Sequence, residues 1–108
     1  MEVRVGQWVR SEGNKLYKVK MYPNNHYDFL AENTTCMIPK KYITKVADTP
    51  QELIEVGDLV LLHHYKLPRI VDEEDCKILK KKYWQQFITK ILTPNSNGGY
   101  DLQWEKNN

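Results

Sequence analysis

The sequence contains little that would assign it to a specialised class of protein. Only two of its 108 residues are cysteines, Cys36 and Cys76, which is too few for the disulfide framework of a small secreted domain. Its longest uninterrupted apolar run covers residues 59–62, whereas a membrane-spanning helix needs about 20 apolar residues. The first residues carry no apolar signal core. We therefore expect a cytoplasmic protein with no membrane partner and with both thiols reduced, in or near the core.

Charge of one sign is not in excess either. Sixteen lysines and arginines stand against 14 aspartates and glutamates, which leaves a net charge of +2 at pH 7. A dedicated nucleic-acid binder is usually much more basic. With 41% apolar and 28% charged residues, the composition excludes a disordered tail. It indicates one ordinary domain or two very small ones.

Strong catalytic signatures are absent from the sequence. It has no glycine-rich phosphate loop, no Cys-x-x-Cys and no nucleophile elbow. His63 and His64 are adjacent, so on a strand they point to opposite faces and cannot bind one metal ion together. Asp58 with Asp75 and Lys77 imitates the spacing of a metal-dependent nuclease, but we interpret residues 72–75 as a solvated turn between strands. We predict no enzyme, no cofactor and no metal site, with a divergent nuclease as a remote alternative.

The chain contains a diverged internal repeat. Residues 5–9 are echoed by residues 56–60 at an offset of 51, and Lys18-Val19 matches Arg69-Ile70 at the same offset. Residues 36–38 then match residues 76–78, and residues 42–46 match residues 87–91. The offset falls from 51 to 40 and then rises to 45, so the second copy lacks eleven residues in its middle and gains five before its last strand.

Alternating apolar residues and turn signals predict short strands throughout. In the first copy we expect strands at 8–10, 16–21, 26–32, 34–38 and 43–46, with turns at 22–25 and 39–42. In the second we expect strands at 59–63, 66–71, 76–79, 87–93 and 100–104, with a hairpin turn at 95–99 and a short helical turn near 79–86. One core should contain Val9, Leu16, Val19, Phe29, Ile38, Ile43 and Val46. The other should contain Val60, Leu62, Ile70, Ile78, Ile88 and Ile91.

Two segments resemble small β-barrels. Ile38-Pro39-Lys40-Lys41-Tyr42-Ile43 is similar to the Ile-Pro-x-x-Tyr-Val segment of SH3-like barrels, which forms their 3₁₀ turn and last strand. Val56-Gly57-Asp58-Leu59-Val60 resembles the first strand of bacterial SH3-like and KOW-type barrels. The resemblance implies an all-β protein of two diverged SH3-like barrels or half-barrels in tandem. The first repeat would span 1–48 and the second 56–108 with a C-terminal hairpin, joined by a linker at 49–55 or fused into one domain.

The whole chain also resembles a family of small proteins of Firmicute phages and mobile elements. These commonly carry Leu-Ile-Glu-Val-Gly-Asp-x-Val in mid-chain, present here at residues 53–60. This resemblance implies a location in the bacterial host cytoplasm. It also implies a non-enzymatic inhibitor of a host protein, such as an anti-CRISPR or another anti-defence protein.

Lysines interleaved with aromatic residues are the most informative polar feature. We predict a principal contact patch, defined as Lys80, Lys81, Lys82, Tyr83 and Trp84, because the second copy gains residues there. A weaker counterpart, Lys40, Lys41 and Tyr42, precedes the closing strand of the first copy. The patch suits an acidic protein surface, since tyrosine and tryptophan are favoured interface anchors. It also suits nucleic acid, with lysines on phosphates and rings stacked on bases, so a nucleic-acid-binding module is the second reading. Exposed strand edges also leave room for a homodimer.

Overall fold

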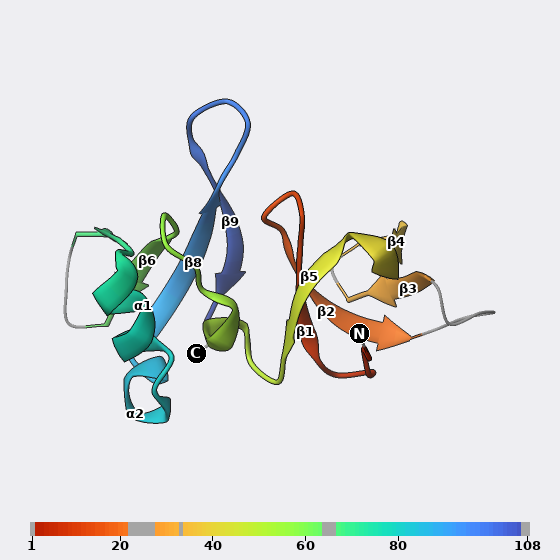
Figure 1. The fold of residues 1–108 in the computed structure, drawn as a ribbon, viewed down its shortest axis with the longest axis horizontal. Coiled ribbons are helices and arrows are strands. Elements are labelled where there is room, and N and C mark those ends of the chain that lie inside the picture. The colour runs from red at the N-terminus through yellow and green to blue at the C-terminus, as the bar shows by residue number, and fades with distance from the viewer. Residues whose placement is uncertain (1, 22–27, 33, 64–66, 107–108) are drawn as a thin grey trace. The chain divides into compact units, whose positions relative to one another are not determined.

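The computed structural model describes residues 2–21, 28–32, 34–63 and 67–106 (Figure 1). The chain divides into two compact units, Met1–Leu53 and Ile54–Asn108, called unit 1 and unit 2 below. Their boundary falls within residues 49–55, the expected linker, of which Pro50–Leu53 form the 3₁₀ turn η2. The expected turn at 22–25 lies outside the described residues, as do His64 and the first residue of the expected strand at 66–71.

Unit 1 is a five-stranded antiparallel sheet. Its strands are β1 (Trp8–Ser11), β2 (Leu16–Met21), β3 (Asp28–Ala31), β4 (Met37–Pro39) and β5 (Ile43–Ala47), and the 3₁₀ turn η1 (Lys40–Tyr42) precedes β5. The order in the sheet is β4-β3-β2-β1-β5, so the last strand returns to pair with the first. Pro39 begins η1 and supplies a fixed φ where the chain turns from β4 into β5.

The core of unit 1 agrees closely with the expected one. Val9, Val19, Phe29 and Ile43 are buried in one cluster, with Ile38 and Val46 packed against it. Leu16 is also buried. Arg10 is a buried cation that the sequence did not reveal. Its guanidinium donates to the Leu53 carbonyl and to Asn14 Oδ1, both at 3.0 Å, which ties η2 to the β1–β2 turn.

Unit 2 combines a four-stranded antiparallel sheet with two short helices. Its elements are β6 (Leu59–Leu62), β7 (Arg69–Ile70), α1 (Glu73–Leu79), α2 (Lys82–Gln85), β8 (Ile88–Pro94) and β9 (Tyr100–Glu105). The sheet order is β7-β6-β8-β9, and Figure 1 shows β8 and β9 side by side below the loop that joins them. That loop is the predicted turn at 95–99, where Gly98 takes a positive φ of 82°. With strands forming both sheets and helices confined to short segments, the all-β expectation is confirmed.

Three expectations for unit 2 are wrong. Residues 76–79 form part of α1 and not a strand, and residues 72–75 begin that helix and are not an inter-strand turn. The cause is a capping box: Asp72 accepts from the Asp75 backbone N–H at 2.7 Å, and the Asp75 carboxylate accepts from the Asp72 N–H. Ile70 and Ile78 are exposed and therefore lie outside the core, whereas Val60, Ile88 and Ile91 are fully buried and Leu62 is half-buried.

The repeat is present in the backbone pairing of the two units. In unit 1, Val9 pairs with Val46 and Ser11 with Ile43, with a bulge after Arg10. In unit 2, Val60 pairs with Ile91 and Leu62 with Ile88, with a bulge after Leu61. Thr44 and Thr89 fill the two bulges alike, since each hydroxyl donates at 3.1 Å to the carbonyl of the facing residue, Arg10 or Leu61.

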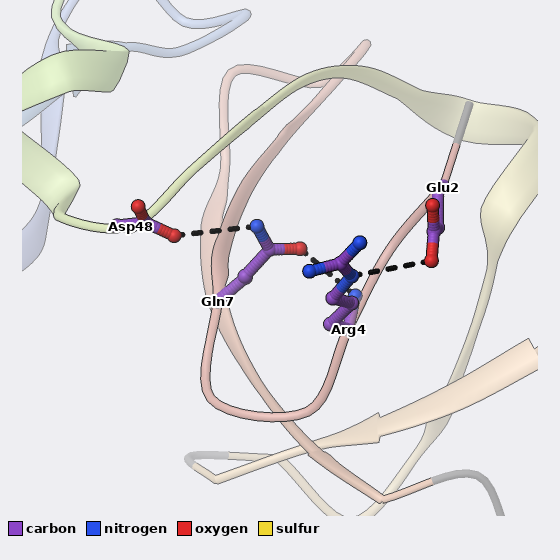
Figure 2. Close-up of polar contacts among 4 residues, drawn as sticks. All are labelled: Glu2, Arg4, Gln7 and Asp48. Atoms are coloured by element: carbon purple, nitrogen blue, oxygen red, sulfur yellow. Dashed lines mark hydrogen bonds and ion pairs between the residues drawn. The ribbon is translucent and has the colours of Figure 1, made fainter.

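The turn that precedes the first strand is also repeated. Gly6 and Gly57 both adopt a positive φ, of 91° and 97°. In unit 1 the Arg4 backbone N–H donates to Gln7 Oε1 at 2.9 Å, while the Gln7 amide donates to Asp48 and the Arg4 side chain pairs with Glu2 (Figure 2). In unit 2 the buried Asp58 carboxylate accepts from the Glu55 N–H at 2.8 Å. Gln7 and Asp58 thus close the same turn with different polar groups.

Hydrogen bonds correct the sequence match at one position. Gly6 donates to the Val19 carbonyl, and the Val19 N–H donates to the Gln7 carbonyl. The same pair of bonds in unit 2 joins Gly57 and Asp58 to Val71. Val71 is therefore the counterpart of Val19, and the match of Val19 with Ile70 was wrong by one residue. On a strand, such a slip exchanges the buried face for the exposed face, which explains why Ile70 is outside the core.

Candidate functional site

The predicted contact patch lies on the two short helices of unit 2. Lys80 caps the C-terminus of α1 and Lys81 caps the N-terminus of α2. Lys82, Tyr83 and Trp84 belong to α2. Local hydrogen bonds hold the segment: the Trp84 N–H donates to the Lys81 carbonyl at 3.0 Å, and the Gln85 amide donates to the Lys80 carbonyl at 2.9 Å. The sequence folds this way because neither proline nor glycine interrupts residues 73–86. The backbone that carries the aromatic side chains is therefore held in place by local hydrogen bonds.

Three aromatic rings form a cluster on this surface. The Tyr83 and Trp84 rings are arranged edge to face, with their centroids 5.6 Å apart. The centroid of the Phe87 ring lies 5.5 Å from that of Tyr83 and 5.8 Å from that of Trp84. Tyr83 remains 66% exposed and Trp84 39% exposed. Rings with this much accessible area are not needed to pack the core. The contacts among the three rings also limit their rotation. The cluster thus presents a preorganised aromatic surface.

Trp84 also forms one wall of a pocket of about 630 Å³. The strand side is lined by Leu62, Leu67, Pro68 and Arg69, and the helix side by Asp75, Ile78, Leu79 and Trp84. Most of these side chains are apolar, and a volume of this order is typical of ligand and side-chain pockets. All of the lining residues belong to unit 2.

One ion pair crosses the pocket wall. Arg69 Nε donates to Asp75 Oδ2 at 2.8 Å. This hydrogen bond, aided by those of the capping box and by the positive charge of Arg69, holds the pKa of Asp75 below its ordinary value, while partial burial acts in the opposite direction. The pair joins β7 to α1 and fixes the pocket's two sides to each other.

The weaker counterpart lies on unit 1. Lys40, Lys41 and Tyr42 make up η1, where Tyr42 is exposed and the Lys41 ammonium lies 5.1 Å from the centre of its ring. A cavity in unit 1 is lined by Lys20, Leu30, Glu32, Thr34 and Thr35, none of which belongs to this surface.

Asp58 and Asp75, the carboxylates of the nuclease-like spacing, both have structural roles. Asp58 is buried and closes the turn before β6, and Asp75 is held by Arg69 and by the helix cap. Among residues 2–21, 28–32, 34–63 and 67–106, no group of three or more metal-ligating side chains comes together. Cys36 is exposed, contrary to its expected place in or near the core, and Cys76 is half-buried, with its thiol donating to the Ile54 carbonyl at 3.3 Å.

The sequence singles out Trp84 as a predicted contact residue but gives no indication of the pocket beside it. Leu67 and Ile78 were read as strand residues, and Ile78 as core. The one available signal was the pair Leu67-Pro68, because proline disfavours a central strand and marks an edge.

No protein-family model matches the chain, and neither the curated proteins nor the solved structures include a significant match. No helix in the described part of the chain is long and apolar enough to cross a membrane. The contact patch and the adjoining pocket are therefore the basis for a functional assignment.

Proposed function

We propose that the protein is a non-enzymatic binding protein that recognises a partner protein through unit 2. The contact surface consists of the contact patch and the adjoining apolar pocket. The observation that carries the proposal is Trp84, which is 39% exposed, clustered with two other rings and part of a pocket wall. Tryptophan and tyrosine next to a pocket are the commonest residues of interface hot spots.

The distribution of charge favours a specific protein partner over nucleic acid. Lys80, Lys81 and Lys82 follow α1, whose first turn carries the acidic residues Glu73, Glu74 and Asp75. Positive and negative groups are thus placed at opposite ends of one short helix. A surface of mixed sign selects a partner with complementary charges, whereas a polyanion would be repelled by the acidic end.

A more specific form of the proposal is a host-directed inhibitor encoded by a phage or mobile element, such as an anti-CRISPR protein, acting in the bacterial cytoplasm. Its support is the sequence resemblance of residues 53–60 and the small size of the chain. An inhibitor of this kind acts stoichiometrically through a surface and needs no catalytic group. The surface that would contact the host protein is the same one.

The test is capture from an extract of the bacterium that carries the gene, using the tagged full chain with and without nuclease treatment. We expect a stoichiometric, nuclease-resistant protein, and we expect Trp84→Ala to weaken its binding by about 2 kcal/mol or more. Leu102→Ala is the matched control, because Leu102 is an exposed apolar residue on β9 of the same unit and outside the patch. Equal capture by wild type and Trp84→Ala would contradict the proposal.

Nucleic-acid binding is the second candidate, favoured by exposed rings next to three consecutive lysines. In that case the catch would be nuclease-sensitive. Each Lys→Ala change would lower the slope of log affinity against log salt by about one. The triple variant of Lys80, Lys81 and Lys82 in a salt series therefore separates the two functions.

A further inference from the structure

Among the described residues, the sheet of unit 2 has no counterpart of β3 in unit 1. In unit 1, β2 pairs with β1 on one side and with β3 on the other. In unit 2 the equivalent strand is β7, because Val71 makes the hydrogen bonds that Val19 makes in unit 1. Within the described residues, β7 pairs with β6 and ends the sheet. Its outer side is the place that β3 occupies in unit 1.

The backbone atoms at this edge can be assigned from the repeat. The carbonyl of Lys18, the residue before Val19, accepts a hydrogen bond from the Glu32 N–H at 3.0 Å, at the end of β3. The corresponding residue in unit 2 is Ile70, which precedes Val71. The backbone N–H and carbonyl of Val71 face Asp58 and Gly57. Because successive residues of a strand point their backbone groups to opposite sides, the N–H and carbonyl of Ile70 point away from β6. No described residue forms a hydrogen bond with the Ile70 carbonyl.

The side chains along this edge are apolar and accessible. Leu67 is 80% exposed and Ile70 60% exposed. Leu67, Pro68 and Arg69 also line the pocket whose other wall is Trp84. In unit 1, β3 contributes Phe29 and Ala31 to the core next to the equivalent strand. An unpaired edge beside an apolar pocket has the two features that strand addition requires, backbone groups for affinity and a pocket for a side chain.

We propose that the β7 edge binds an extended segment of the partner protein as an added strand, with an apolar side chain of that segment in the pocket. This inference rests on the proposed function and specifies the kind of partner. The segment takes the position that β3 has in unit 1, and one of its N–H groups donates to the Ile70 carbonyl. Carboxylates flanking the apolar anchor would be attracted by Lys80, Lys81 and Lys82, so the segment has acidic residues on either side of its apolar ones, as residues 28–32 of unit 1 have.

The strand β3 supplies a probe. A capped peptide with the sequence of residues 28–32, Asp-Phe-Leu-Ala-Glu, is titrated into the ¹⁵N-labelled full chain, in which unit 1 already contains its own β3. The control peptide is identical but N-methylated at the glutamate, which removes the N–H that the Ile70 carbonyl would accept. Because the control differs in the peptide alone, the fold of the protein is the same in both titrations.

We expect saturable shifts of the amide signals of residues 67–71 and of the Trp84 indole, and binding about tenfold weaker for the N-methylated peptide. Absence of shifts up to about 5 mM peptide would overturn the proposal. Equal binding of both peptides would also overturn it, because the pocket would then hold a side chain without strand pairing. That second result leaves the proposed function intact. The proposed function itself fails only if capture of the partner is independent of Trp84.

Discussion

Replacing Val71 and Ile70 separately tests the register of the repeat and the core of unit 2. Val71 is 1% exposed, so Val71→Ala removes two buried methyl groups and leaves a small cavity. At about 0.8 kcal/mol for each group, plus the cavity term, the free energy of unfolding should fall by about 1.5–3 kcal/mol. Ile70 is largely exposed, so Ile70→Ala should change it by about 0.5 kcal/mol or less, although it removes more carbon atoms.

The loss at Val71 would be large for so small a unit. A unit of about 55 residues has a total stability of about 3–8 kcal/mol, so Val71→Ala should remove a major share of it. With a urea m-value near 1 kcal/mol per molar, the midpoint of unit 2 should move by about 1.5–3 M.

The assay must report on each unit, because the chain has tryptophans in both. Urea unfolding followed by the NMR amide signals of Ile91 and Val9 separates unit 2 from unit 1. Val19→Ala is the matched control, because Val19 is the counterpart of Val71. It should lower the urea midpoint reported by the Val9 signal and leave the midpoint reported by the Ile91 signal unchanged. A cost at Ile70 equal to or greater than that at Val71 would refute the register derived from the hydrogen bonds.

Two further predictions concern local backbone and charge. Gly57→Ala should destabilise unit 2 by about 1 kcal/mol or more in the same assay, because the φ of 97° is strained for alanine although an added Cβ would meet no atom within 4 Å; unchanged stability would contradict this. Asp75 has its folded-state pKa lowered from 3.8, so its contribution is fully present above about pH 5 and is lost as the pH falls below 3.8 through the folded value. Asp75→Asn should therefore flatten the dependence of stability on pH below about 5, and should cost about 1 kcal/mol at neutral pH through the lost helix cap. An unaltered pH profile would show that Asp75 is not the group responsible.

Most of unit 1 could be predicted because its local signals agree with one another. The apolar alternation in β2 and β3, the glycine before β1 and the proline before η1 all favour the observed strands. The repeat then extended the prediction to β6 and β8, whose pairing follows that of β1 and β5 residue by residue. Agreement among independent signals made these elements predictable.

The helix α1 was missed because a weak long-range match outweighed a strong local signal. Cys76 and Ile78 were aligned with Cys36 and Ile38 of the first copy, which predicted a strand. The segment Asp72-Glu73-Glu74-Asp75 instead carries the acidic first turn and the reciprocal side-chain bonds of a helix N-terminus. A capping box acts through bonds between residues three apart, so it decides the local conformation whatever the distant copy does.

The pocket could not be predicted because it arises from what the second copy has lost. In unit 1 the β3–β4 hairpin brings Phe29 and Ala31 onto the face formed by β1 and β2. In unit 2 two short helices follow the corresponding strands, and although Leu79 is buried, Ile78 and Trp84 remain accessible at the pocket. Between the matched strand residues, unit 1 has 23 residues from Val19 to Ile43 and unit 2 has 16 from Val71 to Ile88, a difference in length that says nothing about surfaces. In unit 2 this segment forms the helices that carry the exposed Tyr83 and Trp84 rings, and no described strand takes the place of β3. Where the β3–β4 hairpin lies in unit 1, unit 2 has an accessible apolar pocket, and this is the surface through which we propose that the partner binds.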